Sequence, residues 1–280
     1  GHEVVAMTRD ASKASDLREA GAEIFEGDLL DGAAVKEAVR KVDAIALHVP
    51  FFMADPQAAA EQIVTAAVET KIEYIVWNTA GIIAPEKTGN PAYDVRLSLK
   101  QLLAESGIAH TILQPTVYAE NLLGPWTAPL VQSSNRVAYP VPEAFKMGWL
   151  PSSDMAKVMR AALEDPSLAG SEWIISGKQI LDGRGLSAAF SQGLGREIQY
   201  YAMPPVEFGQ ILDQIMGEGA GAAVAREYQA IWDGQAQPQM YVEMDETLAR
   251  LGVQFSDLKD WVAQFHFLFK ADQQTLSHEQ

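Results

Sequence analysis

Short apolar runs alternate with segments of helical periodicity through the first 115 residues, and this alternation is the strongest constraint on the fold. Strands are predicted at residues 3–7, 22–25, 44–49, 72–77 and 111–113, and helices at 12–20, 33–41, 56–68 and 94–105. Asp55-Pro56 supplies an N-cap and a first-turn proline for the third helix. Strands and helices that alternate through short links predict a parallel sheet covered on both faces. The expected fold class is α/β, with a doubly wound parallel Rossmann-like sheet.

The alternation fails after about residue 120, where prolines at 125, 129, 140, 142 and 151 mark an irregular stretch. Helices are predicted from about Ser153 and over residues 206–232 and 256–269. Residues 173–176 are typical of one more strand, which we expect to return to the main sheet. We therefore predict a doubly wound domain over residues 1–150 and a smaller, mostly helical lobe over residues 151–280.

Composition excludes several classes of protein. The absence of cysteine excludes disulfides, thiolate zinc sites and cysteine nucleophiles, and it fits a cytoplasmic protein. The 37 acidic against 21 basic side chains give a formal charge of −16, so we expect no binding to nucleic acid. No apolar run approaches the ~18 residues of a membrane helix, so no membrane association is expected. The five histidines show no metal-binding spacing, and no metal is expected.

The glycine turn that would hold a dinucleotide pyrophosphate is missing from the front of the sheet. In such sites the residue that reads the adenosine ribose follows the glycines by about 20 positions. Thr8-Arg9 best fits that later position, so the glycines are expected ahead of residue 1, and the first domain is expected to lack its first strand and glycine loop. Two internal G-x-G-x-x-A patterns begin at Gly183 and Gly217, and ordinary turn glycines explain both better than a phosphate site.

Several fragments share their order and spacing with a known family. The sequence resembles the NmrA-like family of atypical short-chain dehydrogenases over essentially its whole length. The fragments are Gly1–Val5, Thr8–Asp10, Ser12–Lys13, Gly21–Glu23, Glu26–Leu29, Val49–Phe51, Val76–Gly81, Gln114–Pro115 and Glu120–Leu123. The resemblance implies an NAD(P)-binding Rossmann domain with NADPH as its cofactor, and a second lobe that meets a small-molecule substrate or a protein partner.

The resemblance also implies which residues bind the cofactor. Arg9 and Lys13 would meet the 2′-phosphate of NADP, and a guanidinium beside an ammonium suits a dianion where an NAD site favours an acid. A solvated surface turn is the alternative. The other implied cofactor residues are Thr8, Asp28 and Leu29 near the adenosine, Val49, Pro50 and Phe51 on the ribose side, and Thr79, Ala80, Gly81, Thr116, Val117, Tyr118 and Ala119 near the nicotinamide. Ordinary packing at strand ends is the alternative for the apolar members. Asn121 is either a substrate contact or a loop amide.

The chain departs from the wider dehydrogenase pattern at the catalytic position. No Y-x-x-x-K motif occurs, and Arg96 stands where relatives carry the lysine. Arg96 could hold ribose hydroxyls or phosphate, but a guanidinium cannot cycle a proton near neutral pH. Tyr93 is a weak candidate for the proton donor, since its helical position is one residue out of step.

We therefore expect an NADPH-dependent oxidoreductase that reduces a quinone or a similar planar, electron-poor compound. A quinone tolerates the missing Tyr-Lys pair because its reduced oxyanion is comparatively stable. The alternative is a non-catalytic NADP-sensing regulatory protein that acts through protein partners, and the missing pair favours it. The sequence leaves the oligomeric state open.

Overall fold

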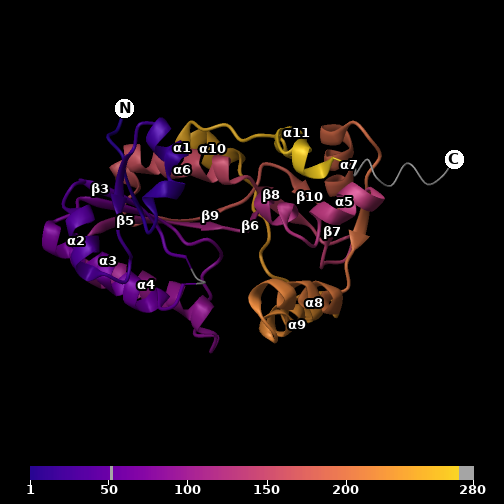
Figure 1. The fold of residues 1–280 in the computed structure, drawn as a ribbon, viewed down its shortest axis with the longest axis horizontal. Helices are drawn as coiled ribbons and strands as arrows, with labels where there is room; N and C mark the ends of the chain where they lie inside the picture. Colours follow the sequence, from indigo (N-terminus) through magenta and orange to yellow (C-terminus); the bar gives the residue numbers. More distant parts are fainter. Residues whose placement is uncertain (51–52, 271–280) are drawn as a thin grey trace. The chain divides into compact units, whose positions relative to one another are not determined.

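A computed structural model describes residues 1–50 and 53–270 of the chain (Figure 1). The chain divides into two compact units, Gly1–Gln114 with Met159–Ile174, and Pro115–Val158 with Ile175–Gln280. We predicted a boundary at residue 150 and a strand at 173–176 that returns to the main sheet. Residues 115–150 group with the second unit, and residues 159–174 group with the first. The strands between 115 and 150 pair with one another and with later strands, which places this stretch in the second unit.

Parallel strands build the first unit, and they confirm the predicted α/β class. Strand β1 (Val5–Thr8) pairs with β2 (Glu23–Glu26) in a two-stranded sheet. A four-stranded sheet has the order β3 (Ala44–His48), β4 (Tyr74–Asn78), β5 (Ala109–Pro115) and β9 (Glu172–Ile175). The register of β3, β4 and β5 aligns Leu47, Trp77 and Ile112 across the sheet. Every residue of β4 is buried, as expected for a strand with partners on both sides.

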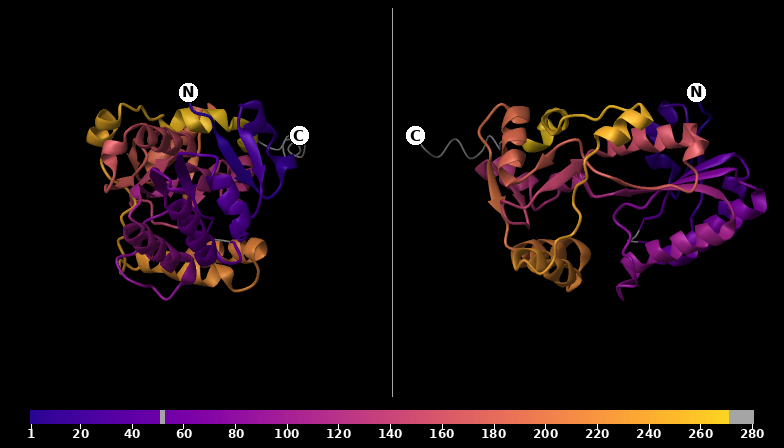
Figure 2. Two further views of the ribbon diagram at one scale, coloured as in Figure 1. Left: turned by 90° about the vertical axis from the view of Figure 1, so that its left-hand side faces the viewer. Right: turned by 180° about the vertical axis from the view of Figure 1, so that it is seen from behind.

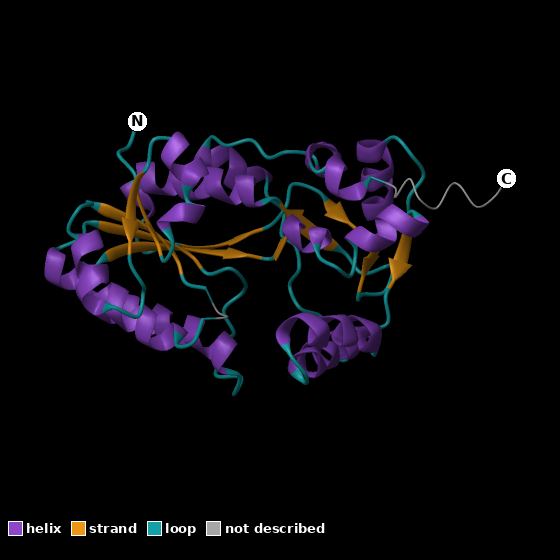
Figure 3. Cartoon of the chain, viewed as in Figure 1, coloured by secondary structure: helices purple, strands orange, loops and turns teal. Residues whose placement is uncertain are grey.

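Three helices of the first unit, α2 (Gly32–Val39), α3 (Pro56–Thr70) and α4 (Pro91–Ser106), bury apolar side chains in one core with the four-stranded sheet. The unit also contains α1 (Ser15–Glu19) and the second half of α6 (Ser152–Glu164) (Figure 3). Asp55 caps α3 by accepting a hydrogen bond from the Ala58 backbone N–H at 2.9 Å. The shared core contains Ile63, Ile75, Trp77, Leu99 and Leu103. Burial of each of these large side chains contributes about 1.5–3 kcal/mol.

The two sheets of the first unit have four edge strands among the described residues, β1, β2, β3 and β9. β1 pairs only with β2, and β3 pairs only with β4. Along β3 the side chains of Ala44, Ala46 and His48 are exposed, whereas Leu47 on the opposite face is buried. One edge and one face of β3 therefore contact solvent.

Short strands and helices together build the second unit. β6 (Val117–Tyr118), β8 (Met147–Leu150) and β10 (Ile180–Leu181) form one sheet in the order β10-β8-β6, and β7 (Arg136–Tyr139) pairs with β11 (Gln199–Ala202). The helices are α5 (Ala128–Ser134), α7 (Gly183–Leu194), α8 (Pro205–Met216), α9 (Ala220–Trp232), α10 (Asp245–Leu251) and α11 (Leu258–Gln264). Short 3₁₀ turns occur at Ala11–Lys13, Ala119–Leu123, Pro166–Leu168 and His266–Phe269. The core of this unit centres on Trp149, Phe190, Trp261 and Phe269.

The helical region predicted over residues 206–232 is confirmed, and it consists of two helices, α8 and α9, that lie side by side as a hairpin (Figure 2). Gly217 and Gly219 break the helix with φ values of 98° and 88°, which side chains with a Cβ rarely adopt. The hairpin is closely packed where Gly209 faces Gly221, since a Cβ on Gly221 would lie 1.9 Å from the Gly209 carbonyl oxygen. Among the described residues, no helix is long and apolar enough to cross a membrane.

Candidate functional site

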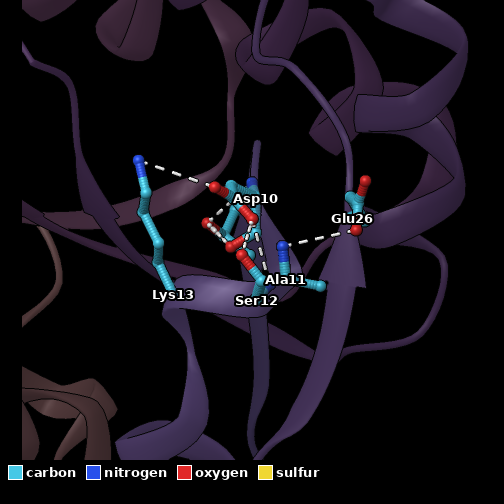
Figure 4. Close-up of polar contacts among 6 residues, drawn as sticks. Asp10, Ala11, Ser12, Lys13 and Glu26 are labelled. Atoms are coloured by element: carbon cyan, nitrogen blue, oxygen red, sulfur yellow. Dashed lines mark hydrogen bonds and ion pairs between the residues drawn. The ribbon is translucent and has the colours of Figure 1, made fainter.

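Asp10 organises the loop that follows β1, where the 2′-phosphate site was predicted (Figure 4). Its carboxylate accepts hydrogen bonds from the Ser12 backbone N–H at 3.0 Å and from the Ser12 hydroxyl at 2.5 Å. These bonds to Ser12, with a smaller contribution from Lys13, hold the pKa of Asp10 below its usual range. The loop also meets β2, because the Ala11 N–H donates to the Glu26 carboxylate at 3.3 Å. A charged carboxylate therefore fixes this loop.

The two predicted phosphate-binding cations differ in their surroundings. The Lys13 ammonium lies 3.5 Å from the Asp10 carboxylate, and the Lys13 side chain is 83% exposed. Arg9 is exposed directly after β1, and no carboxylate of the described residues lies within 4.0 Å of its guanidinium. A 2′-phosphate would need a cation whose charge is not already neutralised, and Arg9 fits that requirement better than Lys13.

The predicted adenosine and ribose residues lie at the ends of β2 and β3. Asp28 is half-buried and accepts a hydrogen bond from the Leu30 N–H at 2.9 Å, which shapes the turn after β2. Leu29 packs against the core cluster that contains Val49. Pro50 is exposed, and the predicted Phe51 lies outside the described residues. The structure thus brings Leu29 and Val49 into one apolar cluster.

The loop after β4 contains Thr79, Ala80 and Gly81, and its conformation is fixed by internal hydrogen bonds. Ala80 has a φ of 53°, a left-handed conformation that costs a residue with a Cβ about 1–2 kcal/mol. The Asn78 side-chain oxygen accepts from the Ala80 N–H at 2.9 Å. The Thr79 hydroxyl donates to the Gly81 carbonyl at 2.5 Å. Backbone strain held in place at the carboxyl end of a strand is a common property of ligand sites.

Arg96 of α4 holds this loop in place through hydrogen bonds to its main-chain carbonyls. Its side chain is buried, and its ε N–H donates to the Thr79 carbonyl at 2.9 Å while an η nitrogen donates to the Ala80 carbonyl at 3.4 Å. Burial lowers the pKa of Arg96. The guanidinium carbon lies 5.5 Å from the centre of the Tyr93 ring, within the range of a cation–π contact. The structure therefore gives Arg96 a positioning role, while its contact with cofactor and the proton-donor role of Tyr93 stay predictions.

A glutamine that the sequence analysis did not select anchors the far end of the same loop. Gln114, at the end of β5, is buried, and its side-chain oxygen accepts from the Ile83 N–H at 2.6 Å. Its amide nitrogen donates to Glu172 of β9 at 2.6 Å, and Glu172 also pairs with Lys100 of α4. A polar residue at the end of an otherwise apolar strand was the signal that could have identified Gln114.

Four of the predicted nicotinamide residues and Asn121 belong to the second unit. The Thr116 hydroxyl donates to the Gly148 carbonyl at 3.2 Å. Val117 and Tyr118 form β6, which pairs with β8, and Ala119 is fully buried. Packing and sheet pairing account for the main-chain positions of these residues, and their contacts with cofactor stay predictions.

Asn121 is exposed, yet its side chain hydrogen-bonds to the buried hydroxyl of Tyr139. That hydroxyl lies 3.0 Å from the Tyr228 hydroxyl. Burial raises the pKa of Tyr139, so the phenol remains protonated and can donate at neutral pH. Asn121 is therefore a satisfied loop amide on one side, and its predicted contact with substrate stays a prediction.

The internal glycine patterns have structural explanations. Asp182 caps α7, and its carboxylate accepts from the Gly185 N–H at 2.8 Å, so a negative charge already lies at this helix start. A Cβ on Gly183 would lie 2.4 Å from the Tyr200 ring, which explains the glycine by close packing. Gly217 and Gly219 form the turn between α8 and α9. Within the described part of the chain, no group of three or more metal-ligating side chains is found.

Comparison with known proteins gives a consistent set of similarities. The sequence profile of the NmrA-like family matches residues 1–261. An NAD(P)H azoreductase of Xenophilus azovorans is 30% identical over 200 residues, which cover 71% of this chain and 68% of that protein.

Two solved structures illustrate the likeness of fold. The NADPH complex of the NADPH-dependent quinone oxidoreductase QOR2 of Escherichia coli has a TM-score of 0.75 and 19% identity, over 93% of this chain and 89% of that one. The NADP complex of NmrA, a negative transcriptional regulator, has a TM-score of 0.74 and 15% identity, over 100% of this chain and 91% of that one.

Proposed function

This chain belongs to the NmrA-like family, and we propose that it binds NADP and reduces a quinone or a similar planar, electron-poor compound. The observation that carries the proposal is the exposed guanidinium of Arg9 at the end of β1, with no carboxylate of the described residues within 4.0 Å. The names of the azoreductase and the quinone oxidoreductase support a reduction that uses NAD(P)H.

The residues present fit a phosphorylated adenosine at this edge. Arg9 would hold the 2′-phosphate through charge-assisted hydrogen bonds, and Lys13 would add a second positive charge if it exchanged its weak contact with Asp10. Leu29, half-buried after β2, packs against the apolar cluster that contains the buried Val49, and it would border the adenosine. When bound, NADPH supplies the hydride, and the protein holds and orients the reactants.

The protein need not supply a proton from a Tyr-Lys pair. Arg96 remains charged, and its ε N–H is engaged by the Thr79 carbonyl, so it fixes the loop after β4 instead of moving a proton. A quinone acceptor suits such a site, because the oxyanion formed by hydride transfer is stable enough to take its proton from water. We therefore assign Arg96 to positioning the loop after β4, and we expect a substrate whose reduced form needs no proton donor from the protein.

The test compares cofactor affinities of the wild type and Arg9→Ala. We expect the substitution to weaken NADPH about 10- to 100-fold, since charge-assisted bonds contribute about 1.5–3 kcal/mol, and to leave NADH nearly unchanged. Arg40→Ala, which removes an exposed arginine just after α2, is the matched control. Equal losses for both dinucleotides in Arg9→Ala would refute the assignment of the phosphate site.

The second candidate function is an NADP-sensing regulator that acts through a protein partner. The engaged guanidinium at position 96 and the likeness of fold to NmrA favour it. The two functions are separated by following NADPH oxidation with a panel of quinones and azo compounds. Turnover supports the reductase, whereas tight NADPH binding without oxidation above background supports the regulator.

A further inference from the structure

A cleft of about 560 Å³ lies within the second unit, and its lining contains none of the predicted site residues. Its walls are the loop between β7 and β8, the last turn of α9, and the segment 234–241 that follows α9. Small-molecule sites usually have volumes of about 300–1,000 Å³, so the cleft is large enough for a two-ring compound.

The apolar floor of the cleft is fixed by the core beneath it. Phe145, Ile231 and Met240 are partly buried and pack against the main core of the second unit. The Met240 carbonyl accepts from the Gly148 N–H of β8 at 2.8 Å, which ties the segment 234–241 to the sheet. An aromatic ring and a thioether on a rigid floor form a good surface for a flat ring.

The start of the segment 234–241 is also held in place. Gly234 turns the chain after α9 with a φ of 68°. The N–H groups of Gln235 and Ala236 then both donate to the Ala230 carbonyl, at 2.8 and 3.0 Å. Both ends of the segment 234–241 are therefore held by main-chain hydrogen bonds, which lowers the entropic cost of binding a ligand against it.

Lys146 gives the cleft its charge. It is the one charged residue among the described residues that line the cleft, and it is exposed. No carboxylate of the described chain lies within 4.0 Å of its ammonium, and Glu143 in the same loop is paired with Arg184 at 2.6 Å. The cleft therefore combines an unneutralised cation with an apolar floor. The Gln237 amide and the Tyr241 hydroxyl add neutral hydrogen-bonding groups at the rim.

We propose that this cleft binds a flat aromatic compound that carries one anionic group. The ring lies on Phe145 and Met240, and the anion, an aryl sulfonate or carboxylate, pairs with Lys146. The inference concerns a binding site and goes beyond the proposed reduction, because it requires neither NADPH nor turnover. If the protein proved not to be a reductase, the proposed binding site would still stand.

The experiment is calorimetric titration of the full chain, without dinucleotide, with 2-naphthalenesulfonate and with the neutral 2-naphthalenesulfonamide. We expect the sulfonate to bind about tenfold more tightly, because a charge-assisted hydrogen bond to a cation contributes more than a neutral one. Lys146→Gln should lower sulfonate affinity about tenfold and leave sulfonamide affinity unchanged. Phe145→Leu should weaken both compounds by removing the ring contact.

Lys259→Gln removes an exposed lysine of α11 outside the cleft lining, and it should bind both compounds as the wild type does. Lys146→Arg keeps the charge and should retain the preference for sulfonate. Three results would each overturn the proposal. The wild type could bind the two compounds with equal affinity, it could bind neither at millimolar concentration, or Lys146→Gln could leave sulfonate affinity unchanged.

Discussion

Single polar residues fix the loops on which the candidate site depends. Asp10 caps the turn that presents Arg9, and Arg96 ties down the loop after β4. The sequence analysis did not select this cap, although an aspartate side chain commonly accepts a hydrogen bond from the backbone N–H two residues later. The role of Arg96 does not, since it depends on the path of a loop 17 residues earlier in the chain. Asp10 and Arg96 therefore illustrate what local pattern can and cannot predict.

Asp10→Asn should raise NADPH affinity by about two- to fivefold, because it removes a negative charge beside Arg9 and Lys13. An asparagine oxygen can still accept the hydrogen bonds from Ser12, so the loop should keep its shape. The effect should persist at neutral and mildly acidic pH, since the lowered pKa keeps Asp10 charged there. As the pH falls through that lowered pKa, the wild-type carboxylate becomes protonated and neutral. The difference in NADPH affinity between the wild type and Asp10→Asn should then vanish. Fluorescence titration with NADPH measures this, and a lower affinity in the variant at neutral pH would contradict it.

Arg96→Met should destabilise the protein by about 2–3 kcal/mol. The substitution leaves the buried Thr79 carbonyl without its 2.9 Å donor, and each lost buried partner costs about 1–3 kcal/mol. Urea unfolding measures the change, with the exposed Arg40→Met as control. If Arg96→Met and Arg40→Met unfold at the same urea concentration, Arg96 does not hold the loop.

Elements with strong periodicity were predicted well, and short ones were missed. The strands and helices of the first unit follow alternation and helical spacing, and the parallel α/β class is confirmed. The second unit contains five strands of two to four residues that lack the regular alternation with helices seen in the first unit, so only their pairing in three dimensions reveals them. The break between α8 and α9 depends on two glycines that a helical pattern alone did not separate.

Gly221→Ala should destabilise the hairpin of α8 and α9 by about 1–3 kcal/mol, because the added methyl group would meet the Gly209 carbonyl. Gly219→Ala is the matched control. Its added Cβ would have nothing within 4 Å, so only the positive φ opposes it, at about 1 kcal/mol. Thermal unfolding compares the two variants, and a smaller loss in Gly221→Ala than in Gly219→Ala would exclude close packing as the cause.

An excess of acidic side chains is the main electrostatic property of the chain as a whole. The formal charge of −16 makes acidic groups repel one another in the folded state, and added salt screens this repulsion. The family follows from ordered sequence fragments, and the match over residues 1–261 confirms it. The division into units does not follow from sequence, because the chain crosses between them three times.

The melting temperature should therefore rise when sodium chloride is increased from about 10 to 150 mM, over which the screening length falls from about 30 to 8 Å. A gain of 1 kcal/mol would appear as about 2–4 °C in a chain of this size. Differential scanning fluorimetry measures the shift, with sucrose at equal osmolarity as a control for non-ionic effects. A fall in melting temperature would show that specific ion pairs outweigh the general repulsion.

The unpaired edges of β1 and β3 affect how fast their main-chain amides exchange with solvent. Each edge presents main-chain amides and carbonyls that have no neighbouring strand in the described part of the chain. Amides without a main-chain partner exchange readily with solvent, so amide deuteration of the chain over residues 1–280 should proceed faster along β3 than along β4, which has neighbours on both sides.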